Sequence, residues 1–267
     1  MTLMINAAEN LRKLREARPV VHNITNFVVM NFTANILLAA GASPVMAHAE
    51  NEVEEMVSFA RALVLNIGTL TDDWVLAMLK AGKKATALGV PIILDPVGAG
   101  ATALRTKAAQ RIIAETHVSV VRGNASEILA LAGGKAKTRG VDAADSVEAV
   151  TEQAVRLARE LGVPVAITGP EDFITNGNRI VRVTNGHPLM ASVTGTGCGA
   201  TAVIAAFSGI DPDPVSAAAT ALAYYGLAGE RASDGAAGPG SFMVRFLDAL
   251  YCLTPDDLEH GCRIIEG

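Results

Sequence analysis

Short apolar runs rich in β-branched residues alternate with longer helical patterns along most of this 267-residue chain. The runs that we expect to be strands are residues 20–24, 44–46, 63–66, 91–95, 118–122 and 164–168. Helical patterns lie between them, at residues 27–39, 51–60, 71–88, 101–115, 125–132 and 146–161. This alternation is typical of a parallel sheet covered by helices on both faces. We therefore predict an α/β fold of three αβα layers with a mostly parallel central sheet.

Two regions depart from the alternation. Residues 172–183 contain Asn176-Gly177 between two strand patterns, which is a strong signal for a hairpin, and we expect it to form an antiparallel edge of the sheet. The last third is helical, with patterns at residues 198–208, 214–231 and 242–253. Since no linker, repeat or low-complexity stretch divides the sequence, we expect residues 1–267 to form a single domain.

Composition excludes several classes of protein. The chain has 22 basic and 27 acidic residues, a net charge of −5, and only 4% aromatic residues, so a nucleic-acid surface is not expected. The three cysteines suggest neither a disulfide framework nor a zinc site. The N-terminus is an amphipathic charged helix, and no apolar run has the length that a membrane span needs. We expect a cytoplasmic protein.

The sequence V-T-G-T-G-C-G-A-T at residues 193–201 predicts a glycine-rich loop that leads into a helix. Glycines let the backbone approach a ligand closely, and the free amides of a first helical turn hold phosphate oxygens. Cys198 lies where these amides converge, and we expect the helix dipole to favour its thiolate. One alternative is a small buried cysteine, and another is a thiol hydrolase, for which only His187 is near in sequence.

Polar residues follow the predicted strands at their carboxyl ends, where open parallel sheets bind ligands. Asp95 and Glu127 come after successive strands, and two such carboxylates suit Mg²⁺, which takes one or two of them together with substrate phosphates. Arg122 is placed to hold phosphate oxygens. In the alternative interpretation, Asp95 caps a turn and Glu127 lies on an exposed helix face.

A dinucleotide-binding fingerprint is matched weakly by G-A-G-A-T-A at residues 98–103, with Glu115 as the ribose-binding acid. The fingerprint requires its glycines directly after the strand, whereas Asp95 and Pro96 intervene here. An NAD(P)-dependent dehydrogenase is therefore a minor alternative.

Six motifs in order make the chain resemble the hydroxyethylthiazole kinase family of the ribokinase-like superfamily. They are V-H-N-I-T-N-F-V-V-M-N-F, G-A-S-P-V-M-A-H-A, L-N-I-G-T-L, I-L-D-P-V-G-A-G-A-T, R-G-N-A-S-E-I and V-T-G-T-G-C-G-A-T. The resemblance implies a ribokinase-like fold and an ATP- and Mg²⁺-dependent kinase. The substrate implied is the hydroxyl of 4-methyl-5-(2-hydroxyethyl)thiazole in thiamine biosynthesis. It also implies a homotrimer whose sites lie between subunits.

The resemblance also implies roles for single residues. It places Met46 and Gly195 on the thiazole with Asn26 beside it, Arg122 and Thr168 on ATP, the amides of Gly197 and Gly199 on the transferring phosphate, and Asp95 and Glu127 on the metal. Most ribokinase-like kinases have G-A-G-D where this chain has G-T-G-C, so Cys198 occupies the position of the catalytic base.

Two further alternatives stay open at this point. One is a related kinase of another small heterocyclic alcohol or a sugar alcohol. The other is a nucleotide-binding module without catalysis. The sequence assigns no role to His22, His48 or His187.

Overall fold

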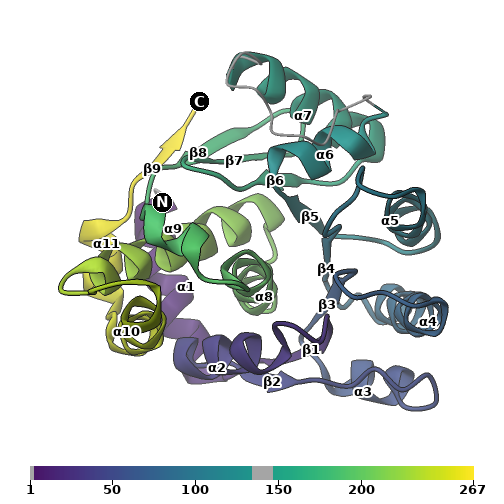
Figure 1. The fold of residues 1–267 in the computed structure, drawn as a ribbon, viewed down its shortest axis with the longest axis horizontal. Helices are drawn as coiled ribbons and strands as arrows, with labels where there is room; N and C mark the ends of the chain where they lie inside the picture. The colour runs from purple at the N-terminus through teal and green to yellow at the C-terminus, as the bar shows by residue number, and fades with distance from the viewer. Residues whose placement is uncertain (1–2, 134–146) are drawn as a thin grey trace.

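The computed structural model describes residues 3–133 and 147–267, and its centre is one nine-stranded sheet (Figure 1). The strand order is β2-β1-β3-β4-β5-β6-β7-β8-β9. Strands β2 to β6 of this order run parallel, whereas β7, β8 and β9 pair antiparallel. Their bounds are β1 Val20–Ile24, β2 Ser43–Val45, β3 Ala62–Asn66, β4 Ile92–Asp95, β5 Val120–Gly123, β6 Val165–Ile167, β7 Asp172–Thr175, β8 Ile180–Val183 and β9 Ile264–Glu266.

Helices cover both faces of the sheet, as Figure 1 shows, and each face has its own apolar core. On one face, α2 (Met30–Ala40), α8 (Thr196–Ser208) and α9 (Pro214–Ser233) contact the sheet. Helices α1 (Leu3–Ala17), α10 (Pro239–Cys252) and α11 (Pro255–Gly261) pack against these helices and extend the same core. The other core packs α3 (Val53–Phe59), α4 (Asp72–Leu88), α5 (Ala103–Glu115), α6 (Ala125–Leu131) and α7 (Val147–Leu161). The predicted three-layer αβα fold is confirmed.

The central strands are buried on both sides, which explains their continuous apolar sequences. In β3, Ala62 and Val64 belong to one core, whereas Leu63 and Leu65 belong to the other. This division follows from the alternation of side chains along a strand. The sheet therefore needs an apolar residue at nearly every position of β3.

The predicted elements differ from the structure in a few places. The helix expected from residue 27 begins at Met30, because the side chain of Asn26 accepts a hydrogen bond from the amide of Val28 at 3.1 Å and forms a turn there. The hairpin is confirmed, with Gly177 at a φ of 91°, but it is not the edge of the sheet. The unpredicted strand β9 pairs with β8 and takes that place. Ser146, the expected start of a helix, lies outside the described residues.

The parallel strands end along one edge of the sheet, and this arrangement positions the candidate site. Asn66 and Asp95 are register partners at the ends of β3 and β4. Helix α8 contacts β1, β3 and β4 and begins beside their carboxyl ends. Among the described residues, no helix is both long enough and apolar enough to cross a membrane.

Candidate active site

Asp95 is the centre of a buried polar network at the end of β4. Its Oδ2 accepts hydrogen bonds from Asn66 Nδ2 and from Thr201 Oγ1, each at 2.8 Å. Arg122 Nη1 lies 3.7 Å from the same oxygen. Burial raises the pKa of Asp95 to about 6, although the positive charge of Arg122 opposes this effect.

Asn26 connects this carboxylate to Cys198. Its Nδ2 donates to Asn66 Oδ1 at 2.8 Å and lies 3.6 Å from the sulfur of Cys198. Asn66 in turn donates to Asp95, as described above. The thiol, two amides and the carboxylate thus form one continuous chain of polar contacts, contributed by β3, β4, α8 and the turn after β1.

The thiol of Cys198 is protonated at neutral pH, so the expected preference for the thiolate is wrong. Burial raises the pKa of Cys198 to about 12, and the negative charge of Asp95 acts in the same direction. Hydrogen bonds from Asn66 and Asn26 and the charge of Arg122 oppose the shift. Burial and the adjacent carboxylate act in the opposite direction to the partial positive charge of a helix N-terminus.

The first turn of α8 offers free amides, but not all those expected. Gly195 is the N-cap residue with a φ of 91°, and the amide of Gly199 already donates to Gly195 O at 2.7 Å. The amide of Gly199 is therefore not free for phosphate, because Gly199 makes the first intrahelical bond. Gly197 and Cys198 precede that bond, and their amides belong to the open turn.

Packing explains why residue 199 is glycine. A Cβ atom at this position would lie 2.5 Å from Ile36 Cδ1 and 2.5 Å from Tyr225 Oη. The Tyr225 hydroxyl donates to Thr196 O at 2.9 Å and so holds the first turn of α8. Sequence reasoning missed Tyr225, which lies 27 residues after Cys198 on another helix, and no motif marks it.

Arg122 lies between the end of β6 and the first turn of α8. Its Nη2 donates to Thr168 Oγ1. A Cβ atom on Gly197 would lie only 3.1 Å from Arg122 Nη1, so the absence of a side chain there leaves the guanidinium beside the open turn. The structure thus brings Arg122, Thr168 and Gly197 together, as the sequence predicts.

Glu127 faces the loop after β4 from the start of α6. Its Oε1 accepts from the amide of Gly98 at 2.8 Å, and its Oε2 accepts from the amide of Asn124 at 2.9 Å in a capping box. It is close enough for its charge to raise the pKa of Asp95. The alternative of an exposed helix face is wrong for Glu127, because the residue is half-buried, caps α6 and lies near Asp95.

In the described part of the chain, one of the two carboxylates has an oxygen that is free for a Mg²⁺ ion, whereas both oxygens of Glu127 accept from backbone amides. Asp95 Oδ1 is buried and has no hydrogen-bond partner among the described residues, so it has a free acceptor for a cation. Within residues 3–133 and 147–267, no group of three or more Asp, Glu, His or Cys residues is arranged to hold a metal. Two carboxylates with water and phosphate oxygens are the ligand set that Mg²⁺ commonly takes in nucleotide sites.

The structure argues against the dehydrogenase and the thiol hydrolase. Glu115 lies at the end of α5, where it pairs with Lys83 and Arg111 instead of following a strand. His187 caps the short helix at Pro188–Ser192 by accepting from the amide of Leu189 at 3.2 Å, whereas the thiol is contacted by Asn26.

Met46 lies apart from this network. It follows β2, the edge strand, and is half-buried. Gly195 packs on the segment after β1, because a Cβ atom there would lie 3.0 Å from Val29 Cγ1. Asn66 and Thr201 complete the site without having been assigned to it. Asn66 could have been found as a polar residue at the end of a strand, and Thr201 as the residue three positions after Cys198 on the same helix.

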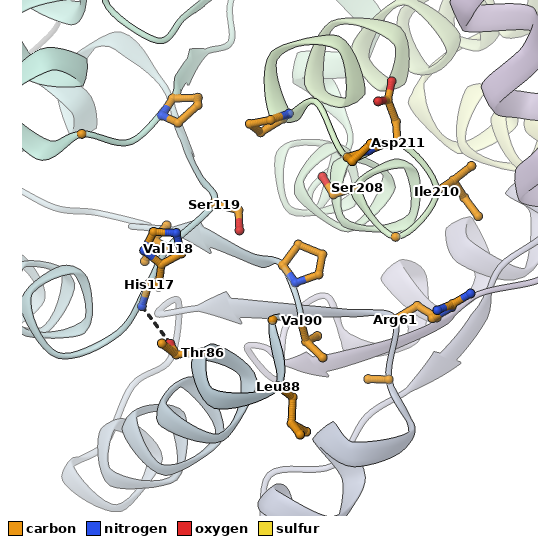
Figure 2. A pocket seen from close by; sticks show the side chains of 18 residues that line it. Arg61, Thr86, Leu88, Val90, His117, Val118, Ser119, Ser208, Ile210 and Asp211 are labelled. Carbon is orange, nitrogen blue, oxygen red and sulfur yellow. Dashed lines mark hydrogen bonds between the residues drawn. The ribbon is translucent and has the colours of Figure 1, made fainter.

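A hollow of about 760 Å³ lies at the opposite end of the sheet, next to the residues that precede the parallel strands (Figure 2). Arg61, Val90 and Ser119 line it from three of these segments. None of the predicted site residues lines this hollow, so it is separate from the candidate site.

Comparison with known proteins decides the family. The hydroxyethylthiazole kinase family matches residues 11–256. The chain belongs to the hydroxyethylthiazole kinase family. It is 62% identical over 265 residues to the hydroxyethylthiazole kinase of Desulfotalea psychrophila, covering 99% of this chain and 97% of the relative. It is 53% identical to that of Moorella thermoacetica, covering 96% of each chain.

Solved structures agree with this membership. The hydroxyethylthiazole kinase protein of Pyrococcus horikoshii OT3 superposes with a TM-score of 0.91 at 45% identity, covering 98% of this chain and 99% of that one. The pyridoxal kinase of Staphylococcus aureus in complex with AMP-PCP and pyridoxal has a TM-score of 0.60 at 18% identity, covering 80% of this chain and 88% of that one. The latter likeness shows the ribokinase-like fold alone.

Proposed function

We propose that this chain transfers the terminal phosphoryl group of ATP to the hydroxyl of 4-methyl-5-(2-hydroxyethyl)thiazole, in thiamine biosynthesis. The observation that supports this best is the open first turn of α8, which lies beside Arg122 and is joined through Cys198 to the buried Asp95 network. An anion site next to a polar network is what phosphoryl transfer to an alcohol requires.

Each residue of the site then has a definite task. Arg122, with Thr168 fixing its guanidinium, and the amides of Gly197 and Cys198 bind phosphate oxygens. Asp95 and Glu127 are the residues that would hold Mg²⁺, which would neutralise phosphate charge. Asn26 orients the alcohol and keeps the thiol in place.

Cys198 lies where the hydroxyl proton of the substrate must leave. Because its pKa is about 12, the resting side chain already carries a proton, and only the small thiolate fraction can accept the proton of the alcohol. Catalysis therefore depends mainly on positioning and on stabilisation of charge, as in other phosphoryl transfers. Proton transfer to this side chain adds a smaller factor.

We also propose a homotrimer in which Met46 reaches the thiazole of a neighbouring subunit. In support, Phe27 and Val28 are 62% and 65% exposed in the single chain, in the turn that carries Asn26. Met46 directly follows the short edge strand β2, so it lies at the same end of the sheet as Asn26, which follows the parallel strand β1. Sedimentation equilibrium tests this, since the expected mass is about three times the 27.6 kDa of the chain.

A coupled assay of ATP consumption tests the proposed activity. ADP formation that requires the thiazole alcohol, with phosphorylated thiazole as product, is the expected result. ATP turnover without any alcohol, or nucleotide binding without turnover, would contradict it. Pyridoxal and a sugar alcohol serve as competing acceptors, and a higher kcat/KM for either would assign a different substrate.

A further inference from the structure

The turn between β6 and β7 reverses the direction of the chain beside Arg122. Thr168 directly follows β6, and Asp172 begins β7, which returns antiparallel with Ile167 opposite Phe173. The amide of Thr168 donates to Gly123 O at 3.0 Å, which continues the pairing with β5. Gly169, the next residue, is exposed and leaves the sheet.

Asp172 closes this turn with its side chain. Its Oδ1 accepts a hydrogen bond from the amide of Gly169 at 3.1 Å, and the residue is only 8% exposed. Burial raises the pKa of Asp172 to about 7, while the Gly169 bond and the charge of Arg122 oppose the shift. A buried carboxyl of this kind costs stability and needs a compensating contact.

The hydrogen bond between Gly169 and Asp172 lies next to the residues of the proposed phosphate site. Gly169 is bonded to Thr168, and the Thr168 hydroxyl accepts from Arg122 Nη2. Arg122 Nη1 is near the free turn of α8. A shift of the backbone at Gly169 would therefore move the hydroxyl that orients the guanidinium.

We propose that Asp172 is a positioning residue for the nucleotide, because it fixes the Thr168-Gly169 turn and thereby the guanidinium of Arg122. The inference rests on the proposed function, in which Arg122 and Thr168 bind ATP. Asp172 should therefore affect the affinity for the nucleotide but hardly affect the affinity for the thiazole alcohol, since the alcohol lies on the Asn26 side of the network.

Two substitutions separate the hydrogen bond from the charge. Asp172→Asn keeps an oxygen that accepts from the Gly169 amide, whereas Asp172→Ala removes it. The probe is a non-hydrolysable ATP analogue, titrated by calorimetry, with KM for ATP and for the alcohol measured in parallel. We expect Asp172→Ala to raise Kd and KM for the nucleotide about tenfold, and Asp172→Asn to stay within about threefold of the wild type.

The same hairpin offers a matched control. Thr175 is fully buried at the other end of β7, where its Oγ1 accepts from the amide of Gly177 at 2.9 Å and donates to Arg179 O at 2.7 Å. Thr175→Val removes both of these side-chain bonds to a turn, so it should lower Tm without changing the Kd of the nucleotide. If Thr175→Val weakened nucleotide binding as much as Asp172→Ala, the effect would come from general loosening of the hairpin, and the inference would be overturned.

Remaining outcomes are equally decisive. An unchanged nucleotide Kd in Asp172→Ala, or an equal rise in the KM of the alcohol, overturns the inference. If Asp172→Ala fails to fold, Asp172→Glu takes its place, because the longer side chain displaces the acceptor and should also raise Kd; an unchanged Kd then counts against the inference.

Arg122→Ala tests the underlying site: if it leaves nucleotide affinity unchanged, the proposed phosphate site itself is wrong.

Discussion

Cys198 shows how strongly its surroundings determine what a single side chain does. The sulfur lies at a helix N-terminus, which alone would favour a thiolate. Burial and Asp95 raise its pKa to about 12, so the protonated thiol dominates at neutral pH. A side chain with a lower intrinsic pKa at this position would be a better proton acceptor.

Substitution of Cys198 tests its part in proton transfer. We expect Cys198→Ser to lower kcat about 10²-fold, the lower end of the usual range for a general base, because a hydroxyl ionises far less readily than a thiol and so supplies less of the anion that accepts the proton. Cys198→Asp should keep substantial activity. Steady-state kcat values for the two variants and the wild type measure this. Equal kcat for serine and cysteine would show that the side chain acts only as a spacer.

The pH profile gives an independent measure of the same role. Below a pKa of about 12, the thiolate fraction grows with pH, so the wild-type kcat should rise between pH 7 and 9 when chemistry limits the rate. The Cys198→Asp variant should rise much less over this range, since a carboxyl ionises at a far lower pH than a thiol in the same surroundings. Identical profiles would argue against proton transfer to residue 198.

The two carboxylates can be tested separately from the alcohol site. Asp95→Asn removes the free buried oxygen, and Glu127→Gln removes the second charge. Both variants should need more Mg²⁺ for half-maximal rate while they retain binding of the thiazole alcohol. Mg²⁺ titrations of activity, together with calorimetry of the alcohol, measure the two effects; an unchanged Mg²⁺ requirement contradicts the assignment.

At the scale of elements, the site depends on how closely α8 packs against its neighbours. Residues of α8 after its first turn are buried almost throughout, with Ile36 of α2 and Tyr225 of α9 against Gly199. Interiors are packed too tightly to absorb even one added methyl group without a shift. The first turn of α8 is thus held from two sides.

Substitution of Gly199 tests this packing. Gly199→Ala should lower the free energy of unfolding by about 1–3 kcal/mol and reduce kcat, because the methyl group must displace Ile36 or Tyr225. Gly240 is the matched control, since a Cβ atom there meets nothing within 4 Å in the first turn of α10. Gly240→Ala should leave kcat unchanged and stabilise by up to about 1 kcal/mol. Urea unfolding measures both; equal stability changes would contradict the packing argument.

At the scale of the whole molecule, buried acids make stability depend on pH. The pKa of Asp172 is about 7 in the folded protein, above its ordinary value of 3.8, so the folded state binds more protons between pH 4 and 7. The protonated Asp172 therefore contributes its full stability below pH 4, and this contribution is lost as the pH rises through 7. His22 acts oppositely, because burial lowers its pKa and stability falls as the pH drops below 6.5.

Asp172→Asn isolates the contribution of one acid. Relative to this variant, the wild type should lose about 2 kcal/mol of unfolding free energy between pH 5 and pH 8. Effects of His22 and Asp95 are present in both proteins and cancel. Urea unfolding at the two pH values and at one protein concentration measures the difference. A difference that does not change with pH would mean that Asp172 titrates normally.

Sequence patterns alone predicted the layers of the fold and the end of the sheet that carries the site. The alternation of apolar runs and helical patterns determined β3, β4 and β5 to within two residues. The proximity of Asp95, Arg122 and Thr168 was also predictable, because parallel strands bring their carboxyl ends to the same end of the sheet. The motif around Cys198 also marked the start of α8 correctly to within two residues.

Only the tertiary structure decided how these residues behave. It showed that the amide of Gly199 is already bonded, that Glu127 caps α6, and that Tyr225 holds the first turn of α8 from another helix. Local pattern specifies where an element begins and which face is apolar. Burial, the charge of neighbours and steric contact arise between elements far apart in sequence, and they set both the protonation of Cys198 and the orientation of Arg122.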